Sequence, residues 1–243
     1  MTVRRTVATA ERVLRQLRHD PRTVALLLVV PCVLLALLRG VFAGHLVVFQ
    51  HAGPPLLAIF PFTTLFLVTS VATLRERTSG TLERLLALPI AKAELLGGYA
   101  MAFSAVAVVQ VSLAAGLALG PLGLKTNLNA GALVGVTLAD ALLGMALGLL
   151  VSAFAATEFQ AVQFMPAVVL PQLLLCGLFA PRASMTTGLR WLSDVLPLSY
   201  AVAALTRPRG WDLAAAADVA VVLAAAALAV ALAAASLRRR APG

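Results

Sequence analysis

The chemically most distinctive group in the sequence is the carboxylate of Asp140, which lies near the middle of a long apolar run, residues 133–154. A carboxylate inside hydrocarbon is costly and is therefore a candidate functional group. It could balance the charge of a cationic substrate, or it could be protonated or hydrogen-bonded and hold helices together. Gln110 and Gln172 lie in two other apolar runs and could contact a ligand, although such residues are more typical of hydrogen bonds between helices.

No group of residues indicates catalysis or metal binding. The three histidines are expected to lie in separate loops, and no paired acids share a helix face within an apolar run. The two cysteines, Cys32 and Cys176, both lie in apolar runs and do not have the spacing of metal ligands. We therefore expect a chain that is not itself an enzyme and that carries no metal or cofactor.

The composition indicates which kind of secondary structure holds Asp140, Gln110 and Gln172. The chain is 61% hydrophobic and 12% charged, with a mean hydropathy of +0.96, whereas soluble domains carry about 25% charged residues. Lipid must therefore be the solvent for most of the chain, and a helix needs about 20 apolar residues to cross it. The sequence predicts an all-α polytopic membrane protein with six transmembrane helices, at residues 24–42, 55–74, 96–119, 133–154, 162–180 and 213–237.

The net charge of +9 does not indicate nucleic-acid binding, because the basic residues alternate with apolar runs instead of sharing one soluble face. If both termini are cytoplasmic, 13 Lys and Arg residues lie inside and 6 lie outside. The positive-inside rule favours this orientation. The excess of Arg over Lys, 17 to 2, and the abundance of Ala are typical of a GC-rich bacterial genome, so we expect the protein in a bacterial inner membrane.

Residues 1–22 are expected to form an amphipathic helix. Six arginines fall on the side opposite an apolar face, which is the pattern of a helix in the headgroup layer. An ordinary surface helix is the alternative. The segment lacks the short apolar core of a signal peptide, and Asp20-Pro21 predicts a break before the first span.

The loop between the second and third spans, residues 75–95, is expected to be cytoplasmic and to contain a short amphipathic helix. Leu82, Leu85 and Leu86 form an apolar stripe at helical spacing, and Glu83 suits the N-terminal end of the helix. Such a helix can present its leucines to a groove on another protein.

Two Gly-x-x-x-Gly pairs, Gly116 with Gly120 and Gly144 with Gly148, allow helices to approach closely. Because this spacing is common in glycine-rich membrane helices, dimerisation through either pair is the less favoured interpretation.

The stretch RERTSGTLERLLALPIAKAELLGG, residues 75–98, resembles the cytoplasmic signature of ABC-2 type permeases, and most closely the daunorubicin-resistance type of half-size permease. A later stretch, residues 158–205, agrees with that family. Its matching residues are Gln160, Gln163, Pro166, Gly177, Pro181, Trp191-Leu192, Pro197-Leu198-x-Tyr200 and Ala204-Leu205. Thr186 and Leu196 depart from the family, where Pro and Asn are frequent, and this puts the outer loop geometry in doubt.

The resemblance implies a single ABC-2 domain over residues 1–243 with the type V exporter layout. It implies a coupling helix at 79–88 and an extracellular re-entrant segment at 181–212. The residues expected to couple to the ATPase are Glu76, Gly80, Thr81, Leu82, Glu83, Leu85 and Leu86; those expected along the substrate pathway are Gln110, Asp140, Gln163 and Gln172; and those expected at the outer gate are Trp191, Pro197 and Tyr200.

The function implied is that of the permease subunit of an ATP-binding-cassette exporter that moves a drug, a lipid or a glycan carrier. The sequence has no G-x-x-x-x-G-K-[ST] loop, so ATP and Mg²⁺ are expected on a separate ATPase subunit. A second permease copy, in a homodimer, and membrane lipid are the other expected partners. An ion-driven secondary transporter is the alternative, but it needs several intramembrane carboxylates and only Asp140 is available. An intramembrane enzyme is a weaker alternative.

Overall fold

The computed structural model describes residues 3–78 and 92–238, and every regular element in those ranges is helical. Six of the helices, α2, α3, α5, α6, α7 and α10, are long and apolar enough to cross a membrane. The all-α fold with six candidate spans is therefore confirmed. The elements are α1 (Val3–Arg18), α2 (Pro21–Val41), α3 (Leu46–Thr78), α5 (Lys92–Leu119), α6 (Ala130–Ser152), α7 (Glu158–Leu175), η1 (Arg182–Ser184), α8 (Thr187–Val195), α9 (Leu198–Thr206) and α10 (Leu213–Arg238).

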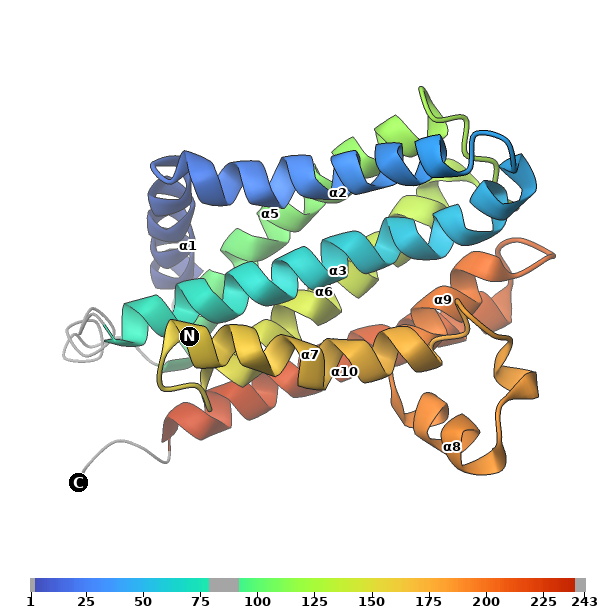
Figure 1. The fold of residues 1–243 in the computed structure, drawn as a ribbon. Coiled ribbons are helices and arrows are strands. Elements are labelled where there is room, and N and C mark those ends of the chain that lie inside the picture. The colour runs from blue at the N-terminus through green and yellow to red at the C-terminus, as the bar shows by residue number, and fades with distance from the viewer. Residues whose placement is uncertain (1–2, 79–91, 239–243) are drawn as a thin grey trace.

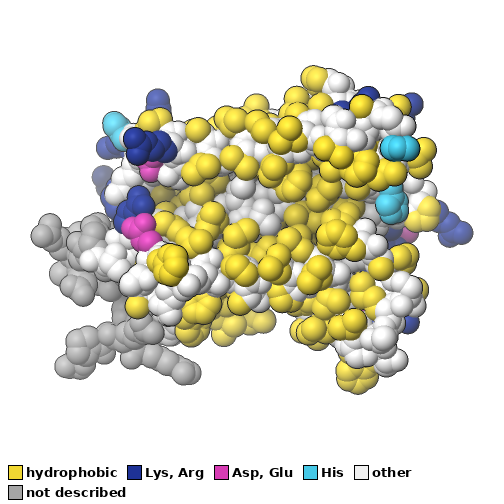
Figure 2. Space-filling view, in the orientation of Figure 1, with side chains coloured by type: hydrophobic (Ala, Val, Ile, Leu, Met, Phe, Trp, Pro, Cys, Tyr) yellow, Lys and Arg dark blue, Asp and Glu magenta, His cyan; other side chains and the backbone are white. Residues whose placement is uncertain are grey.

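The six long helices run alongside one another, and α1 lies crosswise over one end of the bundle (Figure 1). The end of α3 and the end of α10 lie at the same end of the bundle as α1, while α8 and α9 lie at the other end. Hydrophobic side chains cover the middle of the visible face, and charged and histidine side chains gather towards its two ends (Figure 2). This distribution suits a bundle with its middle in hydrocarbon and its ends in water.

Helix α6 is the centre of the bundle and packs most extensively against α3. Two glycines of α6 make this close approach possible. A Cβ atom on Gly144 would lie 2.2 Å from the carbonyl oxygen of Phe62, and one on Gly148 would lie 2.5 Å from that of Phe66. Because these glycines pack within the chain, the interpretation of Gly144-x-x-x-Gly148 as a dimer contact is wrong. A Cβ on Gly116 would meet no atom within 4 Å.

The second span is longer than expected. Helix α3 starts at Leu46, not at residue 55, and ends at Thr78. The residues before the first proline pair were expected to form a loop, but here they are helical, and His51 lies in α3. One reason is that the Gln50 side chain pairs with the α5–α6 loop, donating to the Gly123 carbonyl (3.0 Å) and accepting from the Lys125 N–H (2.5 Å).

The fifth span lies four to five residues earlier than expected, over Glu158–Leu175 instead of 162–180. Its start is defined by Thr157, whose hydroxyl accepts a hydrogen bond from the Gln160 N–H at 3.2 Å. Its end precedes Gly177, which has φ +95°, a conformation that favours glycine and ends the helix.

The predicted break at Asp20-Pro21 is confirmed, although α1 ends at Arg18 and Arg22 belongs to α2. Asp20 caps α2, accepting from the backbone N–H of Thr23 at 3.2 Å and from its hydroxyl at 2.6 Å. These hydrogen bonds lower the pKa of Asp20, so its carboxylate stays ionised and keeps capping α2 at neutral pH. This capped junction between α1 and α2 directs α1 across the end of the bundle.

Candidate functional site

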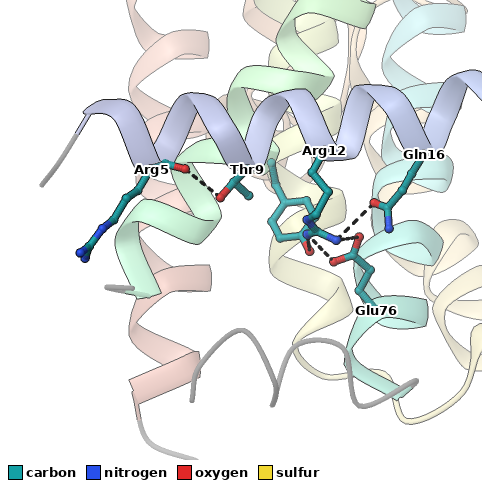
Figure 3. Close-up of polar contacts among 6 residues, drawn as sticks. Arg5, Thr9, Arg12, Gln16 and Glu76 are labelled. Atoms are coloured by element: carbon teal, nitrogen blue, oxygen red, sulfur yellow. Dashed lines mark hydrogen bonds and ion pairs between the residues drawn. The ribbon is translucent and has the colours of Figure 1, made fainter. Parts of the chain in front are cut away.

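One guanidinium joins three helices at the end of the bundle where α1 lies. Arg12 of α1 donates to both carboxylate oxygens of Glu76, near the end of α3, over 3.2 and 3.0 Å. The same guanidinium donates to the Tyr99 hydroxyl of α5 at 3.1 Å. Figure 3 shows Arg12 and Gln16 pointing from α1 towards Glu76. A bidentate pair of this kind fixes both orientation and distance.

The surroundings of this group favour the charged pair. The side chains of Arg12 and Glu76 are 29% and 15% exposed, and Tyr99 is buried. With its amide nitrogen turned towards Glu76, Gln16 donates to that carboxylate at 2.9 Å and accepts from Arg12 at 3.3 Å. Removing one partner would leave a largely desolvated charge unpaired, which costs more than an exposed salt bridge contributes.

Helix α1 also packs directly against α5. Thr6 and Thr9 are buried, and a Cβ on Gly98 of α5 would lie 2.5 Å from the Cβ of Thr9. The Thr9 hydroxyl donates to the Arg5 carbonyl at 3.0 Å (Figure 3), and an Arg5 side-chain nitrogen lies 3.9 Å from a Glu94 carboxylate oxygen. Helix α1 is thus fixed to the first turns of α5 as well as to the last turn of α3.

This arrangement involves the last turn of α3 and the first turns of α5, the two described helices on either side of the segment predicted to couple to an ATPase. Of the seven coupling residues, only Glu76 lies within the described ranges; Gly80, Thr81, Leu82, Glu83, Leu85 and Leu86 lie outside them. Glu76 faces α1, so its coupling role, which stays a prediction, would act through α1. Sequence reasoning missed Arg12, Tyr99 and Gly98. The only signals were two threonines on a basic helix and the Gly97-Gly98 pair.

The four predicted pathway residues do not share one exposed surface. Gln110, Asp140 and Gln172 are buried, whereas Gln163 is exposed on α7. The Gln110 amide donates to the Thr64 hydroxyl of α3 at 2.6 Å, which is a bond between helices. Among the described residues, neither carboxylate oxygen of Asp140 has a hydrogen-bond partner. A substrate would reach Asp140 only after the helices around it had moved.

The predicted outer-gate residues lie in and between α8 and α9. Trp191 is 75% exposed on α8, and Pro197 stands between the two helices. The Tyr200 hydroxyl donates to the Asp194 carbonyl at 2.7 Å, which ties α9 to α8.

A serine pair missed in the sequence attaches these two short helices to α7. Ser193 donates to the Leu175 carbonyl at 2.8 Å and lies 3.1 Å from the Ser199 hydroxyl. The pair is fully buried. Helices α8 and α9 are therefore bonded to the end of the spanning helix α7. Any movement of α7 would displace them.

The structure has six candidate spans and an N-terminal helix that lies across one end of the bundle, where its Arg12 bonds to both α3 and α5. These features define a polytopic membrane protein. The family model described as ABC-2 type transporter matches residues 4–207, and the chain belongs to this family.

Two relatives agree with the family assignment. The chain is 26% identical over 149 residues to "ABC transporter G family member 20" of Dictyostelium discoideum, covering 61% of this chain and 20% of that protein. It is 29% identical over 150 residues to "Probable multidrug ABC transporter permease YbhR" of Escherichia coli strain K12, covering 60% of this chain and 40% of that protein. The matched region thus spans a fifth to two-fifths of these relatives.

Proposed function

We propose that this chain is the membrane-spanning permease subunit of an ATP-binding-cassette exporter. The observation that carries the proposal is the family match over residues 4–207. The 243 residues contain no Walker-A loop, so in this proposal ATP and Mg²⁺ bind to a separate ATPase subunit. Transport is by alternating access, and ATP drives it because the ATPase binds the two conformations of the permease with different affinity.

The brace formed by Arg12, Glu76 and Tyr99 supports a mechanical role for this end of the bundle. The segment proposed to contact the ATPase leaves α3 two residues after Glu76 and reaches α5 at Lys92. Helix α1 contacts α3 through Glu76 and α5 through Tyr99 and Gly98. A displacement of the segment would therefore move α1, α3 and α5 together.

The proposed substrate is hydrophobic or amphiphilic, and the relative named as a probable multidrug permease supports drug export and a contribution to antibiotic resistance. We place the complex in a bacterial inner membrane, with both termini cytoplasmic and with two permease copies. The exposed apolar side chains of α2 and α7 leave area for a second copy. Asp140, Gln110, Gln163 and Gln172 are proposed to contact the substrate once the bundle opens, and Trp191, Pro197 and Tyr200 to close its outer side.

The test is transport by the reconstituted complex. Inverted vesicles that contain the permease and its ATPase should accumulate a hydrophobic fluorescent dye when ATP is added. Accumulation should continue when ionophores remove all ion gradients. Loss of transport with the gradients, with ATP still present, would replace this proposal by an ion-driven transporter.

The coupling segment gives a sharper prediction. Leu85→Asp should abolish retention of the ATPase, because it places a carboxylate where an apolar anchor worth about 2 kcal/mol or more is proposed to bind. Ala87→Asp, on the opposite side of the predicted helix, is the matched control and should retain it. Co-purification of the ATPase measures both. Equal retention by the two variants would show that residues 79–88 are not the coupling helix.

The proposed topology is tested by cysteine labelling in a chain whose Cys32 and Cys176 are replaced by alanine. Ser184→Cys, in exposed η1, should react with a membrane-impermeant maleimide added outside intact cells. Ala8→Cys, exposed on α1, should react only after the cells are opened. The reverse pattern would invert the orientation.

A further inference from the structure

A groove of about 450 Å³ lies between α1, α2 and α5, away from the Arg12–Glu76 pair. Its walls are apolar side chains from all three helices. They include Leu14 and Leu17 of α1, Leu28 of α2 and Val106 and Val109 of α5. Val109 is half exposed, so the groove opens on the side of the bundle, where the spanning helices would meet lipid.

Arg15 and Arg18, both exposed on α1, line this groove together with Glu11. Arg15 pairs with Glu11 at 2.6 Å, which neutralises one unit of charge. Arg18 makes no salt bridge to any residue within 3–78 or 92–238. The groove therefore combines an apolar interior with a cationic rim that carries one uncompensated charge.

Position and chemistry together select one occupant. Helix α1 lies across the end of the spans (Figure 1), so its arginines stand at the depth of the headgroups while the groove between α2 and α5 continues towards the hydrocarbon. A phospholipid has this order of parts, with a phosphate above acyl chains. Basic pockets between spanning helices at the cytoplasmic side bind anionic headgroups.

A neighbouring cavity on the other side of α1, of about 470 Å³, differs in charge. It is lined by Arg75 but also by Asp20 and Glu76, so its two acids outnumber its one cation. The groove has a net positive rim, whereas this cavity does not. Only the groove therefore has the charge expected of a site selective for anionic lipid.

We propose that the groove between α1, α2 and α5 is a binding site for one anionic phospholipid of the leaflet that contains α1. The phosphate pairs with Arg18 and Arg15, and an acyl chain lies against Leu28, Val106 and Val109. The proposed lipid site is formed by this chain alone. It does not depend on the proposed transport function or on an ATPase subunit.

The test uses the purified full chain and native mass spectrometry with added dioleoylphosphatidylglycerol or dioleoylphosphatidylcholine. The unaltered chain should retain one phosphatidylglycerol in preference to phosphatidylcholine. Arg15→Gln with Arg18→Gln should weaken phosphatidylglycerol retention about thirtyfold, since each cation near an anionic headgroup contributes about fivefold. Arg4→Gln with Arg190→Gln removes the same net charge away from the groove and should have little effect.

A variant that keeps every charge distinguishes a built site from diffuse attraction. Val109→Trp fills the groove from its open side and should reduce phosphatidylglycerol retention as strongly as the arginine pair does. Near-ultraviolet circular dichroism and a monodisperse elution profile check that each variant is folded. Equal losses from both arginine pairs, or full retention by folded Val109→Trp, would overturn the proposal.

Discussion

Gly144→Ala is expected to disrupt the centre of the bundle. The added methyl group would lie 2.2 Å from the carbonyl oxygen of Phe62 and 2.9 Å from its carbonyl carbon and Cα. These are backbone atoms, so no rotamer change can relieve the clash, and α3 and α6 must separate along their contact. Overpacking of a core usually costs about 1–3 kcal/mol, and a clash with backbone belongs at or above the upper end of that range.

The control is a glycine with the same spacing motif on a neighbouring helix. Gly116→Ala adds the same methyl group where no atom lies within 4 Å, so stability should be unchanged or slightly increased by the better helix propensity of alanine. The temperature at which the detergent-solubilised chain loses its monodisperse elution peak compares the two. Similar temperatures for Gly144→Ala and the unaltered chain would refute the close approach of α3 and α6.

Charge reversal in the brace should have the next largest effect. Arg12→Glu places two carboxylates face to face beside buried Tyr99, and it removes two charge-assisted hydrogen bonds to Glu76 and one to the Tyr99 hydroxyl. We expect a loss of about 3 kcal/mol or more, because breaking a largely buried pair leaves the remaining charge uncompensated. Proteolysis at the junction of α1 and α2 should accelerate, since α1 then loses its contact with α3.

Restoration of the pair separates this contact from a general effect of charge. Arg12→Glu with Glu76→Arg returns opposite charges to the same two positions, and it should recover much of the lost protease resistance. Arg4→Glu, at an exposed position on the same helix, makes the same change in net charge and should leave protease resistance unchanged. A double variant as damaged as Arg12→Glu alone would show that the pair is not what holds α1.

The number and type of the spanning helices could be predicted from the sequence because hydropathy alone determines which segments enter lipid. The break at Asp20-Pro21 was predictable as well, since a proline that follows a capping residue has a local signature. The start of α3 was not. Prolines and a histidine in residues 46–55 are typical of a loop. Yet the segment is helical, and the Gln50 side chain within it is hydrogen-bonded to Gly123 and Lys125 of the α5–α6 loop.

The contacts among Arg12, Glu76 and Tyr99 were predictable only in part, because they join residues that are distant in the sequence. Glu76 belongs to a local sequence motif, but its partner Arg12 is 64 residues away and is one of six arginines in the N-terminal segment. Nothing in the spacing of those arginines distinguishes the one that meets a carboxylate. The packing of Thr9 on Gly98 depends on the angle at which α1 crosses α5, which is a property of the assembled bundle.

The buried carboxylate of Asp140 also has a consequence for biosynthesis. It stands ten residues into α6, about 15 Å from the start of the helix and thus near mid-membrane. An aspartate at that depth opposes insertion by about 2.5–3.5 kcal/mol, whereas each Leu or Val favours insertion by about 0.3–0.6 kcal/mol. The seven leucines and three valines of α6 together offset the aspartate. Helix α6 can therefore leave the translocon as a single span, and α3, made earlier, is already in the membrane to shield its carboxylate from lipid.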